Sequence, residues 1–309
     1  MISIILIALN NLNELKITLP ALQTAVNALK QSSEVEIILS DDGSIDGSPE
    51  WVQQNYPEIH YFWHKNLGRG PNRNFGADHA QDEYLIFMDA DIEVEPAALS
   101  GLLAPLREHA DGICFGNLRL ATGDHLSPLV RYLAQKFEKL MRRFAENLDP
   151  WDSFSGLFSI TRNLFARMNG FSADFKQYGG EDTEFFLRCS QAGARFVFAK
   201  AGLGWHHQAL DLKSNLRRVY LGSYSNALIA RKRLPVSDDI GAAMHFGRVW
   251  YERLLAFLTL HRLWSWLVFL HPLLEFLPAQ NKAAFYFYHF LFEELAQKGR
   301  DAGLKALNP

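Results

Sequence analysis

The stretch EYLIFMDAD, residues 83–91, is an apolar run that ends in two carboxylates one residue apart. Five consecutive apolar residues with aromatic and branched members are typical of a strand buried on both faces of a sheet. Unpaired carboxylates are too costly to keep in such a core, so the strand must deliver them to the edge of the sheet. Asp89 and Asp91 would point to the same side, where both can face one divalent cation. The alternative is a solvated acidic loop, because short motifs often match by accident.

The composition is that of an ordinary globular protein. The chain has 309 residues, 48% of them hydrophobic and 21% charged, which suits one large α/β domain or a domain with a substantial appendage. A net charge of −3 gives no indication of nucleic-acid binding, which usually needs a clear basic excess. Cys114 and Cys189 lie far apart without metal-ligand spacing, so we expect reduced thiols in a cytosolic protein, with a disulfide as the less favoured alternative. The apolar N-terminus has no basic leader and is expected to form the first strand.

Apolar strand-like segments alternate with helical ones along much of the chain. We expect strands at residues 2–9, 35–40, 59–63, 83–91, 112–118 and 195–199, and helices after Thr18, from Ser48, at 72–80, up to about 109, and at 126–147. This β-α repeat predicts a parallel sheet with flanking helices. Ligands of such sheets bind at the carboxyl ends of the strands, which here carry Asn10, Asp41, Asp42, Asp89 and Asp91. Their position favours a binding site over a solvated loop.

Three motifs make the prediction more specific. SDDGSIDGS at residues 40–48, NLG at 66–68 with RNFG at 73–76, and MDAD at 88–91 resemble, in order and spacing, the signatures of family 2 glycosyltransferases. The resemblance implies a GT-A fold, which is Rossmann-like and mostly parallel, a nucleoside-diphosphate sugar as donor, and Mn²⁺ or Mg²⁺ held by the Asp-x-Asp. Leu9 departs from the family, where an aromatic residue commonly precedes Asn10 and stacks near the base.

The resemblance also implies roles for single residues. Asp91 is the first choice as metal ligand, and Asp89 is expected beside the ribose and the metal. Asp42, or alternatively Asp41, can accept a hydrogen bond from the N–H of a uracil. Arg73 or Arg69 could pair with the diphosphate, unless either is a solvated surface charge. The residues expected at the nucleotide sugar are Ala8, Asn10, Asp41, Asp42, Arg69, Arg73 and Asp89.

A second group of acids lies in YGGEDTE, residues 178–184. Two glycines before two acids suit a tight turn into a helix, where acids are favoured for structural reasons alone. The segment resembles the acceptor-side motif of family 2 enzymes and the galactosyltransferase-type C-terminal module, which implies that Asp182 is the general base and that Glu181 orients it or binds the acceptor. The related modules carry a metal-binding histidine after this helix, for which His206 is favoured and His207 is the alternative.

The last third of the chain contains no recognisable motif. Residues 213–233 are basic, and the tail from residue 245 is rich in aromatic residues but has no apolar run long enough to span a membrane. Its helices are expected either to pack on the sheet domain or a second subunit, or to lie in a membrane interface. We therefore expect a GT-A domain at 1–210, with a nucleotide-sugar half at 1–118 and an acceptor half at 119–210, and a helical region at 211–309.

These expectations define a metal-dependent, inverting glycosyltransferase. It would move a sugar from a UDP-sugar to a hydroxyl of a glycan or lipid-linked acceptor, in the cytoplasm or peripherally on the inner membrane face. The alternatives are a retaining transferase and a protein that binds a nucleotide sugar without turning it over. The sequence does not identify the sugar, the acceptor or the linkage, because acceptor specificity in such folds resides in variable loops and appended helices.

Overall fold

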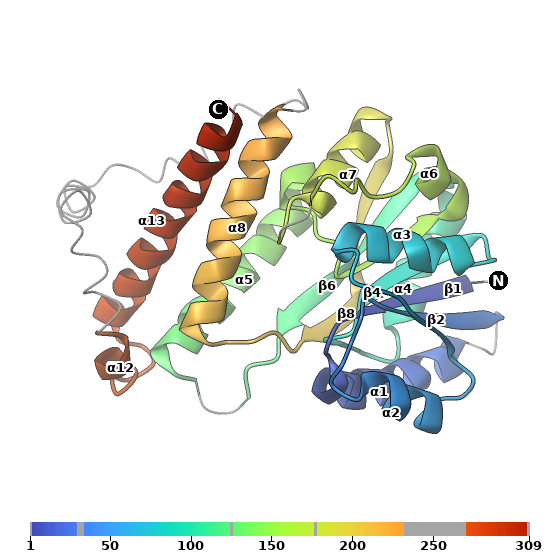
Figure 1. Ribbon diagram of the computed structural model, residues 1–309, viewed down its shortest axis with the longest axis horizontal. Helices are drawn as coiled ribbons and strands as arrows, with labels where there is room; N and C mark the ends of the chain where they lie inside the picture. Colours follow the sequence, from blue (N-terminus) through green and yellow to red (C-terminus); the bar gives the residue numbers. More distant parts are fainter. Residues whose placement is uncertain (1, 30–33, 124–125, 176–177, 232–269, 308–309) are drawn as a thin grey trace. The chain divides into compact units, whose positions relative to one another are not determined.

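A computed structural model describes residues 2–29, 34–123, 126–175, 178–231 and 270–307 (Figure 1). The chain forms two compact units. Unit 1 comprises residues 1–121 and 137–208, and unit 2 comprises residues 122–136 and 209–309. Residues 122–136 thus group with the C-terminal part of the chain, whereas the sequence placed them in the sheet domain.

The described part of unit 1 is built on one eight-stranded sheet with the order β3-β2-β1-β4-β7-β6-β8-β5. Strands β3, β2, β1 and β4 are parallel to one another, and β6 is parallel to β8. This confirms the mostly parallel α/β sheet. The strands are β1 (Ile2–Ala8), β2 (Val35–Asp41), β3 (His60–Trp63), β4 (Tyr84–Asp89), β5 (Ile92–Val94), β6 (Gly112–Leu120), β7 (Leu157–Thr161) and β8 (Arg195–His206).

Two strands of this sheet were missed. β7 lies between β4 and β6 and is antiparallel to both, and β5 is antiparallel to β8 at the edge of the sheet. Each is short, so neither leaves a clear periodic pattern in the sequence. The helices of unit 1 cover the sheet: α1 (Leu12–Leu29), α2 (Ser48–Asn55), α3 (Arg69–His79), α4 (Ala98–Glu108), α6 (Arg162–Arg167), α7 (Glu181–Gln191) and the 3₁₀ turn η1 (Pro150–Asp152).

The start of helix α1 was predicted wrongly. The helix begins at Leu12, not after Thr18, and contains Pro20 in its interior. Thr18 does not cap the helix, because it is fully buried and its hydroxyl donates to the carbonyl of Ala90 at 2.8 Å. The acceptor at the true start comes from a distant turn, since Asp46 Oδ2 accepts from the Leu12 N–H at 2.9 Å. Local sequence therefore did not reveal this helix start.

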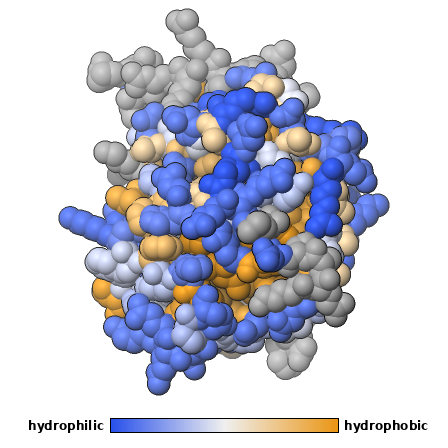
Figure 2. Space-filling model, turned by 90° about the vertical axis from the view of Figure 1, so that its right-hand side faces the viewer, coloured by the Kyte–Doolittle hydropathy of each residue, from blue (hydrophilic) through white to orange (hydrophobic). Residues whose placement is uncertain are grey.

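The two faces of β4 belong to different halves of the core. Ile86 and Met88 lie in the cluster that α1 and α4 cover, while Leu85 and Phe87 lie in a second cluster, rich in phenylalanine, beneath α7. The rings of Phe87 and Phe158 stack with centroids 4.8 Å apart. This confirms that the strand is buried on both faces. Outside the core, the face drawn in Figure 2 is mostly hydrophilic, with apolar side chains between the polar ones.

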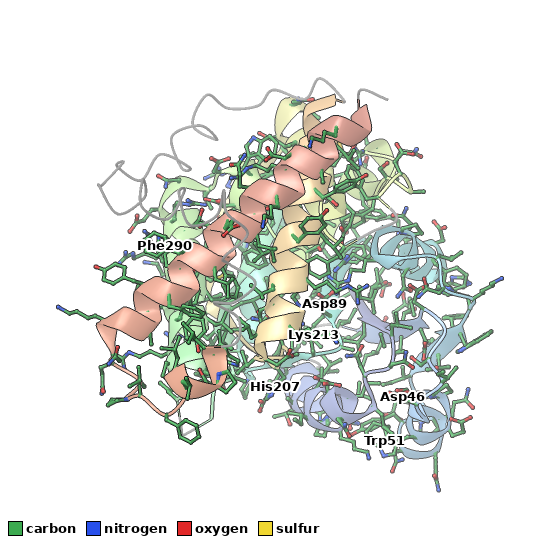
Figure 3. All side chains as sticks on the ribbon, turned by 60° about the vertical axis from the view of Figure 1, so that its left-hand side comes forward. Asp46, Trp51, Asp89, His207, Lys213 and Phe290 are labelled. Atoms are coloured by element: carbon green, nitrogen blue, oxygen red, sulfur yellow. The ribbon has the colours of Figure 1, made fainter. Side chains whose placement is uncertain are left out.

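Unit 2 is helical where the structure describes it. It contains the start of α5 (Pro128–Asn147), α8 (Leu212–Arg231), α12 (His271–Leu274) and α13 (Lys282–Leu307). Helices α8 and α13 lie side by side (Figures 1 and 3). Their contact needs glycine, because a Cβ on Gly299 or Gly303 would lie 2.2 or 2.6 Å from a carbonyl oxygen of α8. Most of the expected aromatic tail, residues 245–269, lies outside the described residues. No helix in the described ranges is long and apolar enough to cross a membrane.

Candidate active site

Polar residues from three neighbouring strands meet at one edge of the sheet. The pairing register sets Ala8 of β1 beside Asp41 of β2, and Ile7 of β1 beside Asp89 of β4. The N–H of Asp42 donates to the Ala8 carbonyl at 2.9 Å. The predicted ends of β1, β2 and β4 thus lie next to one another, at the edge where open α/β sheets bind ligands.

Asp41 is fully buried and holds the turn that follows β2. Its Oδ1 accepts from the N–H groups of Gly43 at 3.0 Å and Ser44 at 2.7 Å, and its Oδ2 accepts from the Tyr61 hydroxyl. Burial, together with this hydrogen bond to the carboxylate, raises the pKa of Tyr61, which keeps the phenol a donor. Asp41 therefore stabilises the turn after β2, and Asp42 is the better candidate to face a nucleobase.

Asp42 fixes the loop that leads into α3. Its two carboxylate oxygens accept from the N–H groups of Leu67 at 2.6 Å and Gly68 at 3.0 Å. Burial raises the pKa of Asp42, and these hydrogen bonds oppose the rise. Each carboxylate oxygen has a second lone pair, so a ligand N–H could still bind to it.

Exposed apolar side chains gather in the loops around this acid. They are Leu9, Ile45, Trp63 and Leu67. Hydrogen bonds tie three of these loops together: Asn10, in a left-handed conformation with φ 53°, donates its N–H to Ser44 Oγ at 2.7 Å and accepts from the Ile45 N–H at 2.9 Å. Trp63 Nε1 donates to the Ser44 carbonyl at 3.3 Å. The sequence suggested no role for Trp63, although an aromatic residue at the end of β3 was a usable signal.

Arg73 lies buried between the two groups of acids. Only 2% of its side chain is exposed; Nη2 lies 2.6 Å from Asp89 Oδ1, and Nη1 lies 3.6 Å from Glu181 Oε1. This burial rules out a solvated surface charge, while contact of Arg73 with a diphosphate stays a prediction. Arg69 is exposed, and its guanidinium lies 4.3 Å from the ring of Tyr178. Of the two arginines, Arg69 is thus the more exposed one.

The turn before α7 brings its acids to Arg73. Gly179 and Gly180 have φ of 83° and 90°, which side chains other than glycine rarely adopt, and the helix starts at Glu181. Burial and the neighbouring Asp182 raise the pKa of Glu181 to about 7, against the lowering effect of Arg73. Burial also raises the pKa of Asp182, although its Oδ1 accepts from the Thr183 N–H at 2.8 Å. Raised carboxyl pKa values at one place are typical of acid–base sites.

The two histidines at the end of β8 have different partners. His206 Nε2 lies 3.2 Å from Asp91 Oδ2, whereas His207 Nε2 lies 2.8 Å from Glu93 Oε2. The geometry therefore favours His206 over His207 as the companion of the Asp-x-Asp. Two adjacent ligands of one octahedral cation lie about 3 Å apart, so Asp91 and His206 fit a shared ion. His206 Nδ1 is buried without a hydrogen-bond partner, and the described residues contain no group of three or more potential ligands. Such an ion would need water or oxygen atoms of a substrate as further ligands.

A mixed sheet of this order, with acids at these strand ends, is typical of glycosyltransferases of the GT-A class, and comparison with known proteins agrees. Residues 3–167 match the glycosyl transferase family 2 model, and residues 135–208 match the N-terminal domain of galactosyltransferase. The chain belongs to glycosyl transferase family 2. It is a glycosyltransferase of GT-A fold, as the motifs predicted.

Two relatives illustrate the range of similarity. The GalNAc(5)-diNAcBac-PP-undecaprenol beta-1,3-glucosyltransferase of Campylobacter jejuni is 28% identical over 235 residues, which cover 71% of this chain and 72% of that enzyme. The cholesterol galactosyltransferase of Borreliella burgdorferi is 40% identical over 83 residues, 26% of this chain and 23% of that enzyme. The chain thus spans only a small part of the second relative.

Two solved structures share the fold. The mannosyltransferase PcManGT from Pyrobaculum calidifontis, in complex with GDP-Man and Mn²⁺, is 16% identical, with a TM-score of 0.62 over 97% of this chain and 86% of that chain. GalNAc-T7 with UDP, GalNAc and Mn²⁺ is 18% identical, with a TM-score of 0.54 over 68% of this chain and 44% of that chain. At these identities the likeness concerns the fold alone.

Proposed function

We propose that the protein is a metal-dependent, inverting glycosyltransferase that transfers a sugar from a UDP-sugar to a hydroxyl of a glycan or lipid-linked acceptor. The buried Arg73 carries the argument, because it touches both Asp89 at the end of β4 and Glu181 at the start of α7. It links the strand end where a donor is expected to the acceptor-side acids. This contact supports a titratable acid close to the proposed donor site.

The donor side has the chemistry that a nucleoside diphosphate needs. Asp42 offers an acceptor to a base N–H, and the apolar side chains around it, Trp63 above all, offer a surface for a flat ring. Arg69 can pair with the diphosphate. GalNAc-T7 holds UDP and PcManGT holds GDP-Man, and Asp42 could accept from an N–H of uracil or of guanine, so the choice of UDP depends on the donor panel described below.

Asp91 and His206 would hold the metal ion, with Asp89 beside it. Mn²⁺ in both solved relatives supports a divalent cation in this site. When bound, the ion neutralises charge that develops on the departing diphosphate. The protein's own side chains would carry out the proton transfer and hold the substrates.

Asp182 would act as the base. As the acceptor oxygen forms its bond to the anomeric carbon, the bond from that carbon to the diphosphate breaks, and the acceptor proton passes to the Asp182 carboxylate. A single displacement of this kind inverts the anomeric configuration. The raised pKa of Asp182 makes its carboxylate a stronger base than an exposed aspartate. The undecaprenol-linked acceptor named for the Campylobacter enzyme supports a lipid-linked acceptor here.

The test measures release of nucleoside diphosphate from a panel of UDP- and GDP-sugars, with Mn²⁺ or with EDTA. We expect slow hydrolysis of one UDP-sugar that EDTA abolishes. Asp91→Asn should abolish it through loss of the metal, and Asp182→Asn should lower it about 10²- to 10⁴-fold while UDP still binds. Asp111→Asn is the matched control, because Asp111 is exposed and pairs with the surface residue Arg167.

Each other result has a defined meaning. Turnover of a GDP-sugar alone would contradict the donor, and full activity in EDTA would contradict the metal. Retention of configuration in the product, measured by NMR, would make the enzyme a retaining transferase. UDP-sugar binding without turnover, even with lipid-linked and oligosaccharide acceptors, would refute the proposed catalysis.

A further inference from the structure

Most of the large apolar side chains that the described part of unit 2 exposes lie between residues 270 and 286. Among the described residues of this unit, those exposed are Leu126, Leu270, Leu273, Phe276 and Tyr286. Phe276 is 88% exposed and Leu273 65%, and both lie in or directly after the short helix α12. The described parts of α8, and of α13 beyond Tyr286, contain no such side chain. Concentration of exposed apolar residues on one part of a surface indicates a contact site.

A cavity of about 240 Å³ lies next to this apolar segment. Its wall includes Arg131 of α5 and Lys282 at the start of α13, together with Gln135, Asn281 and Tyr286. The described residues that line it include no carboxylate. Two cations and several amide groups around one cavity match the charge and hydrogen-bonding capacity of a phosphate group.

Glu275, which lies in the same part of the unit, is engaged by other groups. Glu275 Oε1 accepts from the Tyr288 hydroxyl at 2.6 Å and from the N–H of Leu129 at 3.2 Å. These bonds direct the carboxylate toward the helices of unit 2. They also join α12 to the start of α5, which brings the apolar segment and Arg131 into one part of the unit.

We propose that Leu273 and Phe276 insert into the interface of an anionic lipid bilayer while Arg131 and Lys282 bind a lipid phosphate. Apolar and aromatic side chains next to basic ones are the usual composition of a membrane-interface surface. A symmetric dimer through the same surface is disfavoured, because its two-fold axis would bring the cations of both copies together. The inference does not depend on sugar transfer.

The experiment is co-sedimentation of the full-length protein with vesicles of phosphatidylcholine alone or mixed with phosphatidylglycerol. We expect binding to the anionic vesicles only, weakened by salt. Leu273→Ser/Phe276→Ser should abolish binding, and Arg131→Gln or Lys282→Gln should each weaken it about fivefold. Lys16→Gln and Ile17→Ser are matched controls on the exposed surface of α1 and should bind as the wild type does.

Several outcomes would overturn the proposal. These are equal binding to zwitterionic vesicles, no loss of binding in the Leu273/Phe276 variant, and equal losses in the α1 controls. If the wild type binds inorganic phosphate at the cavity but no vesicle, the cavity takes a free phosphate instead. If sedimentation velocity shows that Phe276→Ser separates a dimer and leaves vesicle binding unchanged, the surface joins two copies of the chain. All variants should keep the thermal unfolding midpoint of the wild type, so that loss of fold does not mimic loss of binding.

Discussion

Replacement of Arg73 by methionine is expected to destabilise the protein, and by an amount that depends on pH. The guanidinium is 2% exposed and lies against Asp89 and Glu181. Removal of one partner from a buried ion pair typically costs about 3–5 kcal/mol, because the remaining charge is left buried and unpaired. The Asp89 side chain is 26% exposed and can recover some hydration, so we expect the lower end, about 3 kcal/mol at pH 8.

The pH dependence comes from Glu181. Its pKa in the folded protein is raised to about 7 from 4.5, so the folded state binds this proton more tightly than the unfolded state does. The contribution of this group to stability is therefore fully present below pH 4.5 and is lost as the pH rises toward 7. Without Arg73 the pKa rises further. The difference in stability between wild type and variant should thus be smaller near pH 5.5, where the loss of the Asp89 pair remains, and should widen above pH 7 by up to about 1.4 kcal/mol per pH unit.

The assay is urea unfolding at pH 5.5 and pH 8. Arg167→Met, which removes an exposed arginine paired with Asp111, is the matched control and should cost less than about 1 kcal/mol. In a Glu181→Gln background, the cost of Arg73→Met should change less with pH, and the remaining change comes from Asp182, whose pKa Arg73 also lowers. The reasoning would be refuted if Arg73→Met unfolded at the same urea concentration as the control, or if its cost were the same at both pH values.

Three further predictions concern single residues. Asp46→Ala should lower the free energy of unfolding by about 1–3 kcal/mol in thermal denaturation, because backbone N–H groups at the starts of α1 and α2 lose their acceptor; an unchanged midpoint would contradict it. Gly76→Ala should cost about 1–3 kcal/mol, since its Cβ would lie 2.5 Å from a β1 side chain, whereas Gly222→Ala meets nothing within 4 Å and should be neutral or stabilising. In titration calorimetry with UDP present, His206→Ala should weaken Mn²⁺ binding more than about tenfold and His207→Ala much less; the reverse order would reassign the ligand.

The sequence predicted the sheet best where a strand was long and ended in acids. Residues 83–91 were expected to form a buried strand, and β4 is buried on both faces with Asp89 at its end. The same pattern located β1 and β2, so the edge that carries the candidate site could be predicted. The sequence predicted poorly those element boundaries that depend on contacts with residues far away in the chain. Helix α1 starts at Leu12 because of Asp46, which is 34 residues distant.

The sequence indicated which residues belong to the candidate site more than it indicated which contacts they make. Arginine at position 73 suggested contact with a diphosphate, but its burial depends on Glu181, more than 100 residues later. His206 and His207 are neighbours in sequence, and only the pairing of β8 with β5 gives them different partners. Trp63 was overlooked because its exposure is a property of the folded loops. Motifs identify residue types, while packing decides which of them reach a ligand.

The place of β7 in the sheet also has a consequence for biosynthesis. β4 has β1 on one side, and its other side pairs only with β7, whose residues follow about 70 positions later in the chain. A ribosome that adds about 5–20 residues per second needs roughly 4–14 seconds for that stretch. During this time the nascent N-terminal half would carry an open apolar strand edge, the kind of edge on which chains aggregate. Overexpression, which crowds such unfinished chains together, should therefore harm the yield of this protein more than that of one whose sheet closes in order of synthesis.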